Sequence, residues 1–175
     1  MIFHYAPDMQ DWINAQKLSM LNLPEYNDYF QGSWISMGSS NTDIGWTHES
    51  MLCSVGDTRV GWVSWNIDRG NDQVDEVGVC IIPRFLNTGA GIVAAAGLLN
   101  YLFVRRRFRR VEFHATNSRA FLYEGCGINR TGTTHSSKKL RDGTFADFVY
   151  FELFPDSTVF KDEKFLKLVS RVKYE

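Results

Sequence analysis

The chain has 175 residues, 44% of them hydrophobic, which is enough to bury the core of one domain spanning residues 1–175. Its 19 basic and 20 acidic residues leave a formal net charge of −1, so we expect neither a nucleic-acid partner nor attraction to acidic membranes. The sequence has no apolar run approaching the roughly 18 residues of a membrane helix, and its start lacks the pattern of a secretion signal, so we predict a cytoplasmic protein.

The first part of the chain predicts a strand, a helix and an aromatic segment. Residues 2–5 form a short apolar run, and Pro7 opens a stretch with apolar residues at helical spacing. Residues 24–34 carry four aromatic side chains and predict a second helix. The Gly, Ser and Asn residues of 38–42 predict a loop.

The middle of the chain predicts a hairpin, a third strand and a buried helix. Apolar runs at 51–55 and 60–67 flank a Gly-Asp turn and indicate two antiparallel strands. Residues 74–82 predict the next strand, which ends at Pro83 because proline cannot continue an interior ladder. Residues 92–104 are almost wholly apolar, which is typical of a helix buried on all sides.

The last third predicts three more strands and two helices. Residues 111–116 alternate apolar and polar side chains, the period of a strand with one buried face. A short helix is expected at 118–124, and apolar runs at 128–134 and 144–153 predict a closing hairpin. The tail after Pro155 has the amphipathic pattern of a C-terminal helix.

The cysteines and histidines indicate a reduced protein without a metal centre. Cys53, Cys80 and Cys126 are odd in number and widely spaced, and two lie in strand-like runs, so we expect buried thiols. The four histidines lack the spacing of metal ligands, and we predict no metal site.

The strongest functional signal is a glycine-rich connection between the strand ending at Ile82 and the buried helix. Gly89 and Gly91 allow backbone to approach a ligand closely, and the N–H groups and positive dipole of the helix start favour a phosphate. Taken alone, a purely structural turn explains about half of such matches. With Ala94 and Glu112 the glycines also satisfy a dinucleotide fingerprint. That alternative requires the first glycine directly after the strand, whereas six residues intervene here.

The connection resembles the pyrophosphate loop of the GCN5-related N-acetyltransferase (GNAT) family. The family pattern is proline, two residues, Gln or Arg, two residues, Gly, any residue, then Gly or Ala. It is matched by Pro83-Arg84-Phe85-Leu86-Asn87-Thr88-Gly89-Ala90-Gly91. The departure is Leu86, where the family prefers Gln or Arg, and Arg84 is the nearby residue that could replace that contact.

The resemblance covers about residues 60–153. It implies an α/β fold with a mixed, mostly antiparallel sheet flanked by helices and a V-shaped split between the two central strands. It also implies that acetyl-CoA is contacted by Cys80, Ile81, Ile82, Arg84, Leu86, Asn87, Thr88, Gly89, Ala90, Gly91, Ile92 and Asn117. Residues 111–117 and the turn at Asp142 are similar to the ribosomal-protein N-terminal acetyltransferase branch.

The implied reaction is transfer of an acetyl group to a primary amine, which must first lose a proton. Glu112 is the first candidate base and Glu76 the second, each directly or through water; for both, a solvated or ion-paired strand glutamate is the alternative. Tyr123 is the candidate acid for the CoA thiolate, and a main-chain N–H near Ile82 could stabilise the oxyanion. Without the resemblance, Tyr123 would be interpreted as a packing residue.

Other features leave further alternatives open. His114 shares the polar face with Glu112 and is a second-line candidate, and Cys126 reads as a small buried residue. Five arginines at 105–110 indicate a solvated helix end, or a contact with RNA, with the CoA 3′-phosphate or with a ribosomal surface. We expect a monomer or homodimer whose acceptor is a protein amine or a small amine, or a catalytically silent CoA-binding module.

Overall fold

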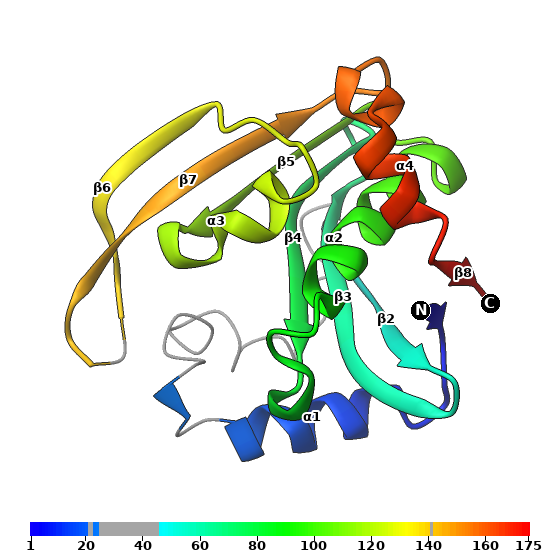
Figure 1. The fold of residues 1–175 in the computed structure, drawn as a ribbon. Coiled ribbons are helices and arrows are strands. Elements are labelled where there is room, and N and C mark those ends of the chain that lie inside the picture. Colours follow the sequence, from blue (N-terminus) through cyan, green and yellow to red (C-terminus); the bar gives the residue numbers. More distant parts are fainter. Residues whose placement is uncertain (21–22, 25–45, 141) are drawn as a thin grey trace.

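A single mixed sheet connects both halves of the chain (Figure 1). The computed structural model describes residues 1–20, 23–24, 46–140 and 142–175, without the side chains of residues 46 and 138. In this part of the chain, eight strands pair in the order β6-β7-β5-β4-β3-β2-β1-β8. Their bounds are β1 Ile2–His4, β2 Trp46–Val55, β3 Thr58–Asp68, β4 Gln73–Ile81, β5 Arg110–Thr116, β6 Gly132–Lys139, β7 Phe145–Leu153 and β8 Lys173–Tyr174.

Helices cover the two faces of the sheet unequally. The helices are α1 Met9–Met20, α2 Ala90–Asn100, α3 Asn117–Glu124 and α4 Glu163–Val169. Side chains of α2, α3 and α4 join one large core with strands β1 to β5 and β7, whereas Ile13 and Met20 of α1 pack with a smaller cluster on the opposite face. Seven of the eleven residues of α2 are buried, as expected for a helix that is apolar all round. No helix among the described residues is long and apolar enough to cross a membrane.

The predicted α/β fold is confirmed, and several element bounds change. The helix predicted at 92–104 ends at Asn100 and continues as a π-helical turn, Tyr101–Arg105. The strand predicted from residue 128 begins at Gly132, because Ile128 is buried in the core, and it extends to Lys139. The two-residue strand β8, which pairs with β1, was missed. The helix predicted at 24–34 lies outside the described residues, apart from residue 24.

The sheet splits between its two central strands. Parallel pairing of β4 with β5 is limited to Gln73–Asp75 with Arg110–Glu112, after which β5 pairs with β7 and β4 with β3. At this point β4 bulges: Trp65 pairs with Val77 and Ile67 with Val74, so two residues of β4 oppose one of β3. The bulge bends β4, and Figure 1 shows β5, β7 and β6 leaving the direction of β4.

Aromatic packing under the split stabilises this arrangement. The Phe113 ring on β5 lies 4.5 Å from the Tyr123 ring and 5.1 Å from the Phe151 ring, centroid to centroid, and its side chain is 1% exposed. We expect Phe113→Ala to lower the free energy of unfolding by roughly 3–5 kcal/mol, because it removes a buried ring and leaves a cavity. Urea titration with Phe145→Ala as control tests this, since Phe145 is 60% exposed. Equal losses in both variants would contradict the packing account.

Candidate functional site

A cavity of about 710 Å³ lies where α2 begins, between the end of β4 and α3. Its volume is in the range of small-molecule sites. It is lined by Pro24, Val79, Ile81, Phe85, Leu86, Asn87, Gly89, Gly91, Ile92, Ser118, Arg119, Phe121 and Leu122. The cavity therefore joins the widening side of the split to the glycine-rich connection.

The connection is shaped by one tight turn and one left-handed glycine. Pro83–Phe85 forms a 3-10 turn directly after β4, and Gly89 caps α2 with φ +83°, a conformation that costs glycine little. Gly91 follows in the first turn, where a Cβ would lie 2.8 Å from Leu122 Cδ2. Main-chain N–H groups in this turn have no acceptor within the helix, so the dipole and its donors are directed to the cavity end.

The twelve predicted acetyl-CoA contacts do not all lie in this cavity. Six of them line the cavity: Ile81, Leu86, Asn87, Gly89, Gly91 and Ile92. Thr88, Ala90 and Asn117 are neighbours of lining residues without being among them. The side chain of Cys80 is buried in the core cluster of α1 on the opposite face.

A second, separate cavity of about 620 Å³ takes up the remaining two predicted contacts. Ile82 and Arg84 line it together with Trp12 and Arg59. Arg84 is exposed there and its guanidinium lies 4.8 Å from the Phe85 ring centroid. Arg84 therefore does not replace the contact that Leu86 lacks in the first cavity.

Arg119 is a cation on the cavity wall that the sequence analysis missed. It stands half-buried in the first turn of α3, facing the same cavity as the start of α2. A positive charge in the first turn of a helix opposes the helix dipole, so Arg119 is not placed there to stabilise α3. This unfavourable position is the signal that could have identified it.

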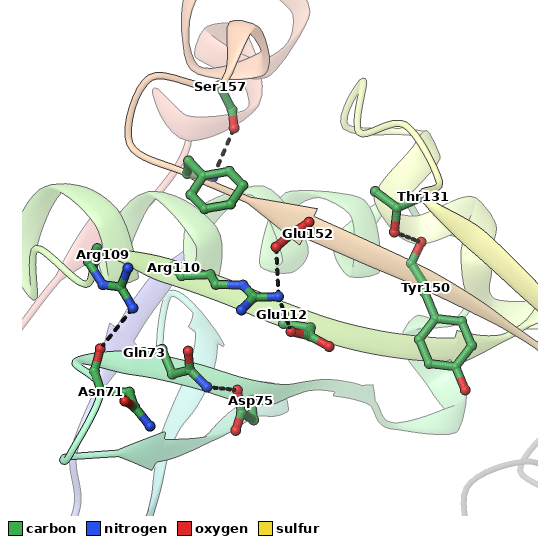
Figure 2. Close-up of polar contacts among 11 residues, drawn as sticks. Asn71, Gln73, Asp75, Arg109, Arg110, Glu112, Thr131, Tyr150, Glu152 and Ser157 are labelled. Atoms are coloured by element: carbon green, nitrogen blue, oxygen red, sulfur yellow. Dashed lines mark hydrogen bonds and ion pairs between the residues drawn. The ribbon is translucent and has the colours of Figure 1, made fainter.

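Three carboxylates gather where β4 and β5 part (Figure 2). Arg110 Nη2 bonds Glu112 and, at 2.7 Å, Glu152 on β7. Asp75 on β4 is the pairing partner of Glu112 and accepts a bond of 3.0 Å from Gln73 Nε2. The first candidate base, Glu112, is therefore half-buried and ion-paired, and Asp75 is a neighbouring carboxylate that the sequence analysis did not single out.

Glu76 occupies the bulge itself. It is exposed, has φ +77°, and its Oε2 accepts a bond of 2.9 Å from Asn66 Nδ2 on β3. A positive φ is uncommon for a residue with a side chain and points to a locally constrained backbone. Both candidate bases thus lie at the closed end of the split, on adjoining strands.

Tyr123 projects from α3 toward β4 beneath the split. Its side chain is 4% exposed and its hydroxyl lies 3.4 Å from the Val77 carbonyl oxygen, just beyond the bulge. Burial raises the pKa of Tyr123, so the hydroxyl keeps its proton at neutral and moderately basic pH. A group in this state can donate a proton but cannot act as a base.

The Ile82 N–H itself is not available as an oxyanion donor, and a role for another main-chain N–H near Ile82 stays a prediction. The Ile82 N–H donates to the Val60 carbonyl at 2.9 Å, which continues the pairing of β4 with β3 beyond the end of the strand. The prediction assumed that pairing stops where proline follows. Proline at position 83 lacks an N–H itself, but it leaves the N–H of the preceding residue able to pair.

The cysteines and arginines have structural explanations. Cys53, Cys80 and Cys126 are buried free thiols, as predicted. Two of the five clustered arginines form ion pairs: Arg106 with Glu49, and Arg110 with two glutamates. The cluster is therefore not simply a solvated helix end.

Asp75 provides a test of the electrostatics at the split. Burial, and then the charge of Glu112, raise the pKa of Asp75, although a bond from Gln73 acts in the opposite direction. A carboxyl whose pKa is higher in the folded than in the unfolded state destabilises the fold once it is ionised. We expect Asp75→Asn to increase the free energy of unfolding at pH 7, and the increase to shrink as pH falls toward 4.

Urea titrations at pH 7 and pH 4.5 measure this difference. Asp156→Asn, at an exposed turn, is the control and should show no such pH-dependent gain. A variant at position 75 that is less stable than the wild type at pH 7 would contradict the assignment.

Comparisons with known proteins identify the fold. No protein-family model matches the sequence, and no curated protein shows significant similarity to it. Among solved structures, a chimera of the spermidine N-acetyltransferase SpeG from Vibrio cholerae and hSSAT matches with a TM-score of 0.62 and 16% identity, over 90% of this chain and 95% of that chain. A GNAT-family acetyltransferase from Bacillus anthracis matches with a TM-score of 0.52 and 17% identity, over 63% and 67%.

A structure of a probable acetyltransferase matches with a TM-score of 0.53 and 21% identity, over 62% of each chain. This chain therefore spans less than two thirds of the length of that protein. The mixed, mostly antiparallel sheet of this chain is unlike the doubly wound parallel sheet of the dinucleotide fold, which needs its first glycine directly after a strand. At identities of 21% or less the likeness is one of fold, and the chain has the α/β fold of GNAT acetyltransferases.

Proposed function

We propose that the protein is an N-acetyltransferase that moves the acetyl group of acetyl-CoA directly to a primary amine in a ternary complex. The observation that carries this proposal is the cavity that joins the start of α2 to the split between β4 and β5. One end offers helix N–H groups suited to a pyrophosphate, and the other is lined by Val79 of β4, two residues beyond Val77, whose carbonyl the Tyr123 hydroxyl contacts. The candidate carboxylates lie further back along β4 and β5 and are not among the lining residues.

The fit of acetyl-CoA is supported by the chemistry of the lining residues. No atom lies within 4 Å of a Cβ at Gly89, which leaves room for phosphate oxygens next to main-chain donors, and Arg119 adds a positive charge. The apolar side chains of Val79, Ile81 and Leu122 suit the uncharged arm that carries the thioester. Leu86 supplies apolar contact where the family prefers a polar side chain.

In the proposed mechanism a carboxylate at the closed end of the split takes a proton from the acceptor ammonium. Glu112 and Glu76 are the two candidates, and Glu112 would have to act while bonded to Arg110. Tyr123, protonated because it is buried, would give a proton to the departing CoA sulfur. The thioester supplies the activated acetyl group.

Two kinds of acceptor are compatible with this mechanism. A protein N-terminus or lysine is favoured by the similarity of residues 111–117 to the ribosomal-protein acetyltransferase branch. A small amine is favoured by the fold of a spermidine N-acetyltransferase chimera, which covers 90% of this chain. Both acceptors are cations at neutral pH, so both suit the carboxylates at the split.

Release of CoA thiol in the presence of different amines tests the proposal. The panel contains peptides with free N-termini, N-terminally blocked peptides with one lysine, spermidine and simple alkylamines. We expect thiol release that depends on both enzyme and amine, with the acceptor gaining the mass of an acetyl group. If acetyl-CoA binds and no amine releases thiol, a catalytically silent CoA-binding module becomes the better account.

A further inference from the structure

A chain of hydrogen-bonded side chains crosses three strands and ends at Glu76. Asn66 Nδ2 on β3 donates to Glu76 Oε2 at 2.9 Å. Asn66 Oδ1 lies 2.8 Å from His48 Nδ1 on β2, and His48 Nε2 lies 3.2 Å from Ser50 Oγ. The strand register places these residues together, because His48 pairs with Asn66 and Asn66 opposes the bulge of β4.

The chemistry of the groups fixes which partner donates in the bonds between His48, Asn66 and Glu76. A carboxylate can only accept a hydrogen bond, so the Asn66 amide must present its nitrogen to Glu76. Its oxygen then faces His48 and can only accept, so His48 Nδ1 must carry a proton. His48 therefore holds Asn66 in the one orientation in which Asn66 can donate to Glu76.

The backbone at Glu76 is also constrained. Asp75 and Glu76 together oppose Asn66 in the bulge, and Glu76 has φ +77°. Bulges turn side chains in new directions, and a left-handed conformation is strained for a residue other than glycine. Glu76 is thus fixed at its backbone by the bulge and at its carboxylate by Asn66, although its side chain is exposed.

The partner of Glu76 differs from the partner of Glu112. Glu112 is bonded to the cation Arg110, which it shares with Glu152. Within residues 46–140 and 142–175, Glu76 makes no ion pair and is held by a neutral amide. A neutral donor orients a carboxylate without neutralising its charge, which suits a group that must take a proton from an ammonium.

We infer that Asn66 is the positioning residue for Glu76 as the base, with His48 and Ser50 holding Asn66 in place. This inference rests on the proposed acetyltransferase function. Glu76 takes one proton from the acceptor ammonium, the nitrogen attacks the thioester carbonyl carbon, and the carbon–sulfur bond breaks. The second proton lost by the nitrogen balances the one gained by sulfur, and Glu76 returns its proton to water.

A double-mutant cycle tests the inference. Asn66→Leu should lower kcat roughly 10- to 100-fold, because a base displaced by about 1 Å loses much of its effect, while the KM for acetyl-CoA stays the same. In a Glu76→Gln background, Asn66→Leu should produce no further loss. The same fold loss in both backgrounds, or no loss in either, would overturn the positioning role.

Substitutions at His48 provide the rescue experiment. His48→Gln keeps an N–H donor for Asn66, so its kcat should stay within about threefold of the wild-type value. His48→Leu removes that donor and should lower kcat, as Asn66→Leu does. Asn129→Leu, at an exposed position away from the chain of bonds, is the control. Melting temperatures identify any variant that fails to fold, in which case the isosteric Asn66→Asp replaces Asn66→Leu.

The wild type in the same assay separates the two proposals. A wild type that releases no thiol with any amine contradicts the proposed function. An active wild type whose kcat is matched by Asn66→Leu contradicts only the role of Asn66.

Discussion

Replacing Gly91 with aspartate is expected to weaken acetyl-CoA binding roughly 100-fold while leaving the fold intact. A carboxylate about 5 Å from a phosphate, at an effective dielectric constant near 20, opposes binding by about 3 kcal/mol. The same negative charge is favourable for α2 itself, because it lies at the positive end of the helix dipole. The added Cβ would lie 2.8 Å from the end of the Leu122 side chain, which must shift, and 3.7 Å from Ile81 Cγ1, an ordinary contact.

Calorimetric titration and thermal unfolding measure these two effects separately. Gly132→Asp is the matched control, because no atom lies within 4 Å of a Cβ at that position and it is outside the cavity. The control should bind acetyl-CoA as the wild type does. A Gly91→Asp variant with unchanged affinity for acetyl-CoA would show that the start of α2 is not part of the pyrophosphate site.

Replacing Tyr123 with phenylalanine is expected to lower kcat roughly 100-fold with acetyl-CoA affinity unchanged. The change removes only the hydroxyl, which touches the Val77 carbonyl at 3.4 Å, and keeps the ring between Phe113 and Phe151. Since burial raises the pKa of Tyr123, the wild type should show no fall of kcat from loss of this proton below pH 10.

Tyr174→Phe provides the control for loss of a half-buried, hydrogen-bonded tyrosine hydroxyl. Tyr174 donates to the Gly97 carbonyl at 2.9 Å on the far part of α2, so its loss affects stability without touching the split. Steady-state kinetics with the best amine of the panel distinguish the two variants. Equal kcat values for Tyr123→Phe and the wild type would reduce Tyr123 to a packing residue.

The sequence predicted the fold well where pattern and packing agree. The apolar helix after Gly91 and the alternation at 111–116 are local signals, and the structure places both in the core as expected. The glycine connection was predicted as a ligand-binding loop, and it lines the cavity of about 710 Å³ at the start of α2. In these places local propensity and tertiary environment favour the same secondary structure and the same buried side chains.

The details of the site depend on strand pairing, which no local pattern gives. The bulge was missed, although the apolar residues Val74 and Val77 are three apart and break the period of two seen in the rest of β4. The ion pair of Glu112 and the bond from Asn66 to Glu76 arise from register between distant strands. The Ile82 N–H is occupied for the same reason, because its pairing extends past the strand end.

Calorimetric titration of the wild-type chain with acetyl-CoA, compared with NAD, tests the central claim most directly. Acetyl-CoA should bind saturably, with one site per chain, because the start of α2 and the adjoining cavity provide donors for its pyrophosphate and an apolar wall for its thioester arm. NAD should not compete. Saturable binding of NAD together with no binding of acetyl-CoA would contradict the account.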